Sequence, residues 1–322
     1  MKKIGILTSG GDAPGMNACI RAAVRTATAS NLEISGISRG YAGLIEGDML
    51  ELDRKSIANI IYQGGTMLET SRCPEFTTTE GRAKAIKVLE KAGIEGLILL
   101  GGDGTFRGGT VLANELNESI IGVPTTIDND VYGTDYTIGF DTAVNTALEA
   151  IDRIRDTAIS HERLFFIEVM GHHTGFIALE SGIAGGAEEM IIPEVTTSTD
   201  ELWTRLRESF EHGKKSAIVV VAEGEQPGHT FAIAQEVKNK LKIESRVCIL
   251  GHVQRGGSPT ARDRVLASNL GSAAVNALLK GKSGYMVGQV KNEIVYTVLA
   301  DTWEKKKALS PRLEELASLL SA

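Results

Sequence analysis

Short apolar runs alternate with stretches of helical periodicity along this chain, and this alternation constrains the possible folds more than any other feature. Runs such as Gly96–Leu100 and Ala217–Ala222 are almost entirely apolar, as strands buried on both faces of a parallel sheet are expected to be. The predicted strands are Lys3–Thr8, Ile34–Ser38, Gly96–Leu100, Ile120–Val123, Leu164–Val169, Met190–Ile192, Ala217–Ala222 and Val247–Leu250. Strands that alternate with helices in this way indicate an α/β fold with mainly parallel sheets.

Helical periodicity is clearest in two of the stretches between strands. Across Asp141–Ala158 the apolar residues Val144, Ala147, Leu148, Ile151 and Ile154 recur at helical spacing. We expect Asp141 or Thr142 to cap the start of this helix. A second helix is predicted over Ala83–Ala92, ending at Gly93.

Composition excludes several classes of protein. Hydrophobic residues make up 42% of the 322 residues and charged residues 23%, close to the average for globular proteins. The net charge of −7 argues against a nucleic-acid or membrane binder, and no apolar run reaches the roughly 20 residues of a membrane span. The apolar run near Met1 ends too early for a signal peptide. Three cysteines without CxxC spacing predict a reduced, cytoplasmic protein without disulfides or zinc.

Glycine gathers after the predicted strands, where open α/β sheets bind their ligands. The first such loop is Thr8–Asn17, which contains Gly10 and Gly11 and leads into a helix. Glycines permit a tight turn there, and the free N–H groups of a helix start attract an anion. The sequence is neither a Walker P-loop nor GxGxxG. The loop alone therefore fits a phosphate site or a plain strand-to-helix turn equally well.

The second loop, Gly101-Gly102-Asp103-Gly104-Thr105, follows the strand Gly96–Leu100. Its glycines can cradle phosphates, and a carboxylate there can hold Mg²⁺, which needs few protein ligands. A strand followed by GGDGT is typical of nucleotide-dependent kinases, NAD and diacylglycerol kinases among them. The alternative is a structural aspartate in a turn.

The third loop is Pro124-Thr125-Thr126-Ile127-Asp128-Asn129-Asp130. Two carboxylates at i and i+2 suit phosphoryl transfer to an alcohol, because one can accept the hydroxyl proton while the other helps to order a metal. The alternative is a capping turn, since Asp and Asn favour turns anyway.

Together these loops resemble the phosphofructokinase family. Further matching motifs are Gly64-Gly65-Thr66 with Arg72, Gly133-Thr134-Asp135, Ile154–Ala158, Ser160–Arg163, Glu168–Gly171, Val221–Gly224 and Leu250–Pro259. The resemblance runs from Lys2 to about Gly288 and is closest to the short bacterial form. It implies two Rossmann-like lobes with the active site between them. Residues 1–139 plus 254–304 would form the nucleotide-binding lobe, and residues 140–253 plus 305–322 the sugar-phosphate-binding lobe.

The resemblance also implies an activity and its residues. The reaction is transfer of the γ-phosphoryl of MgATP to the 1-hydroxyl of fructose 6-phosphate, a step of glycolysis. The implied catalytic residues are the base Asp128, the phosphate-bridging Arg72, Thr126 and the second acid Asp130. The implied nucleotide site comprises Gly11, Arg72, Cys73, Gly102, Asp103, Gly104 and Thr105, with Asp103 at the Mg²⁺. The implied sugar-phosphate site comprises Thr126, Ile127, Asp128, Arg163, Met170, Gly171, His172, Glu223, Arg246, His252, Val253, Gln254 and Arg255.

The order of residues along two strands predicts a shared site. Arg163 and Arg246 each precede a predicted strand, whereas Met170 and His252 follow the same two strands. A strand of four to six residues spans roughly 13–20 Å, so one sugar phosphate cannot contact both ends of both strands. We therefore expect both arginines to reach the substrate from a neighbouring subunit, and the resemblance implies a homotetramer.

A regulatory site is predicted as well. Arg21 and Arg25 are four residues apart on one helix and so share a face; a solvated helix face is the alternative. The resemblance implies an effector pocket for ADP or phosphoenolpyruvate, formed by Arg21, Arg25, Arg54, Arg155, Gly186, Ala187, Glu188, His212, Lys214 and Lys215.

Three positions depart from the family pattern. Thr125 stands where ATP-using members usually have Gly and pyrophosphate-using members Lys, and it is expected to narrow the space beside the donor phosphates. Gly104 matches the ATP users, so ATP is the expected donor and pyrophosphate the alternative. His172 and His212 replace basic residues of the substrate and effector sites. A regulatory subunit without catalysis is the alternative from a different class, and intact Asp103, Asp128 and Arg72 argue against it.

Overall fold

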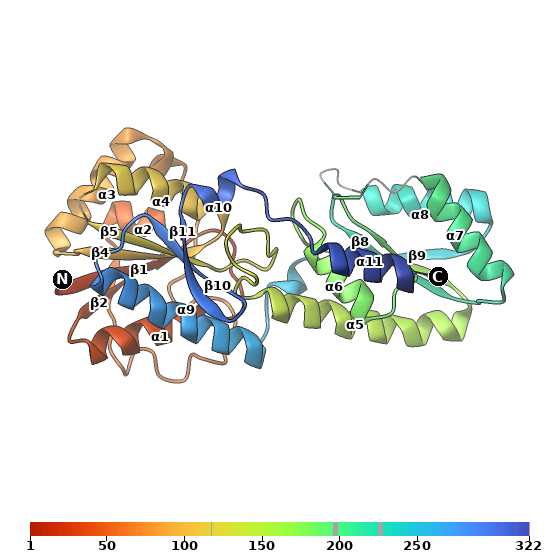
Figure 1. The fold of residues 1–322 in the computed structure, drawn as a ribbon, viewed down its shortest axis with the longest axis horizontal. Helices are drawn as coiled ribbons and strands as arrows, with labels where there is room; N and C mark the ends of the chain where they lie inside the picture. The colour runs from red at the N-terminus through yellow and green to blue at the C-terminus, as the bar shows by residue number, and fades with distance from the viewer. Residues whose placement is uncertain (117, 196–198, 225–227, 322) are drawn as a thin grey trace. The chain divides into compact units, whose positions relative to one another are not determined.

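The computed structural model describes residues 1–116, 118–195, 199–224 and 228–321. The chain divides into two compact units, Met1–Thr142 with Arg255–Lys307 and Ala143–Gln254 with Ala308–Ala322 (Figure 1). The predicted lobe boundaries differ by only a few residues from the three points at which the chain passes from one unit to the other. Which ligand each lobe binds stays a prediction.

A seven-stranded sheet forms the centre of the first unit, in the order β11-β10-β5-β4-β1-β2-β3. Its strands are β1 Lys3–Thr8, β2 Glu33–Ile37, β3 Met49–Glu51, β4 Gly96–Gly101, β5 Ser119–Pro124, β10 Tyr285–Val290 and β11 Glu293–Val298. The five strands from β2 to β10 pair in parallel, and only the two edge strands, β3 and β11, pair antiparallel.

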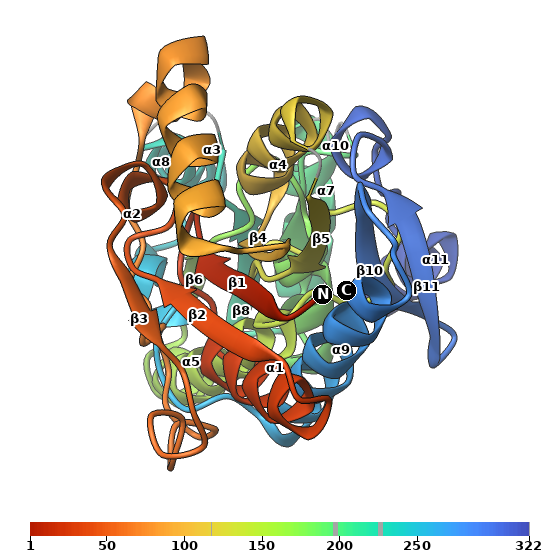
Figure 2. The same ribbon diagram turned by 90° about the vertical axis from the view of Figure 1, so that its left-hand side faces the viewer.

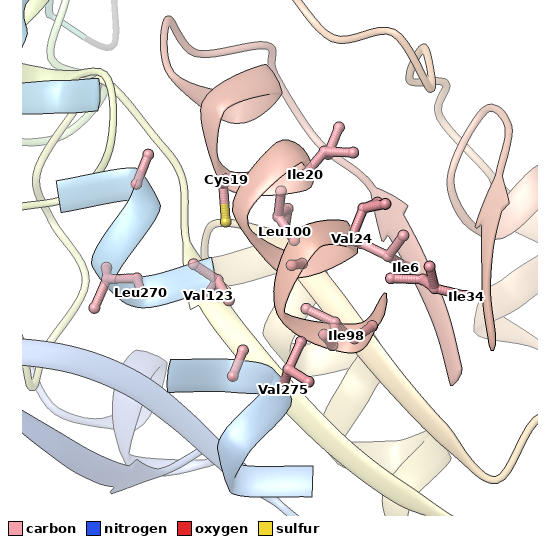
Figure 3. Packing of buried hydrophobic residues seen from close by; sticks show 14 of the residues in the cluster. Ile6, Cys19, Ile20, Val24, Ile34, Ile98, Leu100, Val123, Leu270 and Val275 are labelled. Carbon is pink, nitrogen blue, oxygen red and sulfur yellow. The ribbon is translucent and has the colours of Figure 1, made fainter. Parts of the chain in front are cut away.

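Helices cover both faces of this sheet (Figure 2). They are α1 Met16–Ala29, α2 Tyr41–Glu46, η1 Pro74–Thr77, α3 Thr79–Ala92, α4 Asp103–Glu115, α9 Ala261–Leu279 and α10 Asp301–Glu304. On one face α1 and α9 pack against the sheet, with Val24 and Val275 beside Ile6 and Ile98 (Figure 3). On the other face α2, α3 and α4 bury a second cluster that includes Phe106. Burial on both faces explains why the central strands are so uniformly apolar.

The second unit has a four-stranded parallel sheet in the order β7-β8-β6-β9. Its strands are β6 Leu164–Val169, β7 Glu189–Ile191, β8 Ala217–Ala222 and β9 Ser245–Ile249. Its helices are α5 Phe140–His161, which begins in the first unit, α6 Phe176–Ala184, α7 Thr199–Glu211, α8 His229–Leu241, η2 Gly251–Gln254 and α11 Pro311–Leu320. Phe166, Trp203 and Val219 lie in its core.

The predicted α/β class is confirmed, and all eight predicted strands are present. The predicted cap of α5 is wrong, because the helix begins at Phe140 and so includes Asp141 and Thr142 in its first turn. The Asp263 carboxylate from α9 accepts the backbone N–H groups of Gly139 at 2.9 Å and Thr142 at 2.8 Å. Within the described ranges, no helix combines the length and apolar character needed to cross a membrane.

Candidate active site

The three predicted phosphate loops leave the sheet at adjacent points. Strands β1, β4 and β5 are parallel neighbours, and Thr8 pairs with Leu100 while Gly101 pairs with Pro124. The ladder continues into the loops, because Ser9 N donates to Leu100 O and Thr125 N donates to Gly101 O, both at 2.9 Å. The loops therefore form one continuous surface at the carboxyl edge of the sheet, where α/β folds place their ligands.

In the first loop, Gly11 lies against the Arg255 guanidinium. A Cβ atom at position 11 would lie 2.4 Å from Arg255 Nη1, so any side chain there would require the guanidinium to move. Arg255 Nη1 donates to Asp12 O at 3.3 Å. The structure thus brings together one residue predicted for the nucleotide and one predicted for the sugar phosphate.

In the second loop, Asp103 is the first residue of α4 and forms a bidentate ion pair with Arg107. The Nε–Oδ1 distance is 2.7 Å and the Nη2–Oδ2 distance is 3.1 Å. Both side chains are about half exposed, and the Arg107 guanidinium also lies over the Trp303 ring, 4.7 Å from its centroid. A Cβ atom at Gly104 would meet nothing within 4 Å, so the space beside the loop is open.

The fit of Mg²⁺ depends on how many protein ligands the ion needs. The described residues include no group of three acidic, histidine or cysteine side chains that could hold a metal alone. Mg²⁺ keeps several waters and is usually bound by one or two carboxylates together with substrate phosphates. The exposed Asp103 carboxylate meets that requirement, provided that it leaves Arg107.

In the third loop, Asp128 is buried and held by its neighbour Thr126. Asp128 N donates to Thr126 Oγ1 at 3.2 Å, and that hydroxyl donates to Asp128 Oδ2 at 3.2 Å. Thr137 also holds this loop: its Oγ1 donates to Thr126 O at 2.6 Å, and its backbone N donates to Asn129 Oδ1 at 2.9 Å. Asn129 has a φ of 55°, which turns the chain between Asp128 and the half-buried Asp130.

Thr125 is 1% exposed, and its hydroxyl finds no hydrogen-bond partner in the part of the chain that the structure describes. Its backbone bridges to Ile138. The side chain is therefore enclosed by protein. This differs from the expectation that Thr125 narrows the open space beside the donor phosphates.

Arg72 and Cys73 precede η1. Arg72 is exposed, whereas Cys73 is half-buried and packs against the cluster under α2 and α3. Just before them, the Thr70 hydroxyl donates to Gly10 O at 2.7 Å. This bond ties the Arg72 segment to the first loop.

The predicted sugar residues of the second unit gather at the carboxyl ends of β6 and β8. The Glu223 carboxylate accepts the N–H groups of His172 at 2.7 Å and Gly171 at 3.3 Å. Met170 N donates to Gln254 Oε1 at 2.9 Å, and Gln254 is fully buried. The His172 side chain is exposed. His252 and Val253 lie in η2 and are also exposed.

Arg163 and Arg246 lie at the amino-terminal ends of β6 and β9, away from the carboxyl ends that Met170 and His252 follow. Leu164 pairs with Ser245 and Phe165 with Arg246, so both arginines lie near the amino-terminal edge, with Arg246 two positions further along than Arg163. Arg246 is the second residue of β9 rather than the residue before it, which corrects the predicted strand start. A six-residue strand such as β6 spans about 20 Å. The separation expected between these arginines and Met170 therefore holds within the second unit.

Several of the predicted effector residues meet in the second unit. Arg155 donates to the carbonyl oxygens of Gly185 and Gly186 at 2.6 Å. The buried Glu188 carboxylate, next to Ala187, lies 3.0 Å from Lys214 Nζ and 3.6 Å from Arg155 Nη1.

The other predicted effector residues have different surroundings. His212 Nδ1 lies 2.6 Å from Glu208 O, and Lys215 pairs with Glu162 at 2.7 Å. In the first unit Arg21 and Arg25 share α1, and Arg54 follows β3. The structure leaves the roles of all these residues as predictions.

Sequence reasoning missed Lys307, which the fold brings to the third loop. Its Nζ donates to Asn129 Oδ1 and to Asp135 O, both at 2.8 Å. Lysine is common on surfaces, and its partners lie more than 170 positions earlier in the chain. No local pattern in the sequence could have identified it.

Comparison of the sequence with known proteins identifies one family. The family model described as Phosphofructokinase matches residues 3–278. The chain is 58% identical to an ATP-dependent 6-phosphofructokinase 1 from Thermus thermophilus and 54% identical to an ATP-dependent 6-phosphofructokinase from Bacillus pumilus, over 100% of this chain and of each relative.

Solved structures give the same result. A phosphofructokinase from Saccharomyces cerevisiae superposes with a TM-score of 0.89 at 34% identity, covering 100% of this chain, which spans 48% of the yeast chain. A pyrophosphate-dependent phosphofructokinase from Marinobacter aquaeolei has the same fold, with a TM-score of 0.86 at 22% identity over 100% of this chain and 92% of its own. The chain therefore belongs to the phosphofructokinase family.

Proposed function

We propose that this protein transfers the γ-phosphoryl group of MgATP to the 1-hydroxyl of fructose 6-phosphate, giving fructose 1,6-bisphosphate and ADP in glycolysis. The observation that carries this proposal is the alignment of three loops at adjacent parallel strand ends, with Asp103 and Asp128 on two of them. Full-length relatives named ATP-dependent 6-phosphofructokinase support the same reaction. A cytoplasmic location follows from that role.

Asp128 is the general base. Its carboxylate takes the proton of the 1-hydroxyl as that oxygen attacks the γ-phosphorus, and Thr126 orients it through the hydrogen bond to Oδ2. Mg²⁺, held through Asp103 with Asp130 nearby, would neutralise the charge of the donor phosphates. Arg72 supplies further positive charge to the phosphoryl oxygens, and bidentate arginine contacts suit such groups.

The sugar phosphate is recognised from the second unit and from Arg255. Glu223 has one carboxylate oxygen that accepts two backbone N–H groups, which fixes the side chain so that it can accept sugar hydroxyls. The other predicted sugar contacts lie at the same carboxyl edge of the sheet: Met170, Gly171, His172, His252, Val253 and Gln254. Ile127 and Thr126 lie beside the reacting hydroxyl.

The donor is ATP rather than pyrophosphate. Open space beside Gly104 leaves room for a nucleotide, and Thr125 offers no positive charge. The test is to incubate the purified protein with fructose 6-phosphate and Mg²⁺, and to compare kcat/KM for ATP and pyrophosphate. A ratio that favours pyrophosphate would reverse the donor assignment, and no turnover with either donor would favour a regulatory subunit.

The active site is shared between subunits of a homotetramer. Arg163 and Arg246 lie at the edge opposite Met170 and His252, so they would bind the phosphate of a sugar held mainly by another subunit. A mixture of inactive Asp128→Asn and inactive Arg163→Ser subunits tests this. Activity should return once hybrids form, because some sites then pair an intact Asp128 with an intact Arg163. Hybrids without activity would place both residues in one subunit's site.

The effector site binds ADP or phosphoenolpyruvate. Arg155 and Lys214 supply positive charge around the buried Glu188. The further cations that the family resemblance implies for this site are Arg21, Arg25 and Arg54. Titration of each effector into the Arg25→Ala variant, compared with the wild type, tests the assignment. An unchanged response in the variant would exclude Arg25 from the site.

A further inference from the structure

The C-terminal part of the first unit contacts the turn between the two carboxylates of the third loop. Lys307 is half-buried, and its Nζ donates at 2.8 Å both to Asn129 Oδ1 and to Asp135 O. The chain leaves the first unit directly after this residue. The neighbouring Lys305 and Lys306 are exposed. Of these three lysines, only Lys307 has a hydrogen bond to the third loop among the described contacts.

Asn129 needs such support. Its φ of 55° is left-handed, a region that residues other than glycine seldom adopt and that Asn enters when its side chain can hydrogen-bond locally. The Asn129 side chain is held at both ends: Nδ2 donates to Asp135 O at 3.3 Å, and Oδ1 accepts from Thr137 N and from Lys307. Asn129 is 3% exposed, so the amide is fixed inside the protein and the backbone turn is fixed with it.

The direction in which Asp128 and Asp130 leave the backbone depends on this turn, since they are the covalent neighbours of Asn129. We propose that Lys307 is a positioning residue for phosphoryl transfer, which fixes the Asn129 turn and thereby holds Asp128 at the distance from which it can take the proton. This inference rests on the proposed function and adds a residue to it.

The first test replaces Lys307 by methionine, which keeps the length of the side chain and removes the charge and the donors. Misplacing a catalytic group lowers kcat more than it lowers substrate affinity. We expect kcat to fall about tenfold, while the KM values for ATP and fructose 6-phosphate stay within about twofold. Lys307→Arg, which can donate to the same two oxygens, should recover most of the loss. Lys306→Met is the matched control and should leave both parameters unchanged.

The second test asks whether Lys307 acts through Asn129. Asn129→Gly keeps the left-handed turn accessible and removes the amide. In that background Lys307→Met should lower kcat by no more than about twofold, because the acceptor is already gone. An equal loss of about tenfold in both backgrounds would overturn the proposed route.

The outcomes separate this inference from the proposed function. A wild-type protein that does not phosphorylate fructose 6-phosphate contradicts the proposed function. An active wild type with an equally active Lys307→Met variant contradicts only the role of Lys307. Thermal unfolding and ATP binding check that each variant is folded. Lys307→Gln, which lacks the charge, should lower kcat in the same way if the methionine variant unfolds, and unchanged turnover would again overturn the inference.

Discussion

Asp128 and Asp103 follow neighbouring parallel strands, but the chain holds their carboxylates in opposite ways. Asp128 is 8% exposed and is fixed through Thr126, which is itself held from below by Thr137. Asp103 begins α4 with a side chain that is 45% exposed, and it pairs with Arg107 one helical turn away. The Asp128 carboxylate is thus enclosed by a hydrogen-bond network, whereas the Asp103 carboxylate is held by a surface ion pair.

The difference matches the two proposed roles, general base for Asp128 and metal ligand for Asp103. A general base acts only from a fixed position within hydrogen-bond reach of the proton, so it benefits from a rigid surround. A metal-binding carboxylate must exchange one cation for another in each cycle of nucleotide binding. An exposed ion pair is worth only about 0.2–1 kcal/mol, and it can therefore be given up at small cost.

The largest expected effect comes from removing the enclosed carboxylate. Asp128→Asn keeps the size of the side chain and removes the proposed base. Loss of a general base typically lowers turnover by about 10²–10⁴-fold, while binding of both substrates should be nearly unchanged. Steady-state kinetics and calorimetric titration of ATP measure the two quantities. Near-normal turnover would show that another group takes the proton.

A smaller effect is expected from loosening the network below the base. Thr137→Val removes the hydroxyl that donates to Thr126 O. A buried carbonyl left without its donor costs about 1–3 kcal/mol. Because Thr126 is half-buried, the free energy of unfolding should fall by at most that amount, and kcat should fall by roughly tenfold. Denaturant unfolding and kinetics provide the measurements.

Thr28→Val is the matched control, since Thr28 Oγ1 donates to Val24 O within α1 at 2.8 Å. Its kcat should equal that of the wild type. Equal kcat values for Thr137→Val and the wild type would mean that the network supports the fold alone.

The smallest effect is expected at the exposed carboxylate. Arg107→Gln removes the guanidinium that pairs with Asp103 and that would compete with Mg²⁺ in the proposed site. Because the pair is exposed, the half-saturating Mg²⁺ concentration should fall by no more than about fivefold, with kcat unchanged. Titration of Mg²⁺ at a fixed ATP concentration measures the half-saturating concentration. A rise in the half-saturating concentration would mean that Arg107 assists the metal site.

The sequence was most informative where local chemistry decides the structure. The apolar runs predicted the central strands, since burial on both faces requires such runs, and the glycine and aspartate motifs predicted all three loops. The start of α5 was misplaced because its N–H groups are satisfied by Asp263, over 120 positions away. The β10–β11 hairpin was missed because its half-exposed strands lack continuous apolar runs.

Lys307 shows that long-range contacts were also missed within the candidate active site. The third loop was predicted from a local pattern, two carboxylates at i and i+2, and the contacts of Asp128 with Thr126 are local as well. The support of Asn129 comes from a residue 178 positions later, and a single lysine in a polar stretch carries no signal of that contact. Long-range hydrogen bonds of this kind appear only when the fold is known.

The contact between Gly11 and Arg255 couples two positions that are 243 residues apart in the chain. A Cβ atom at position 11 would fall on the present place of the guanidinium, so Arg255 would have to change its rotamer to make room. We therefore expect the effect of a substitution at Gly11 to depend on the side chain at position 255, which is the residue predicted to bind the sugar phosphate.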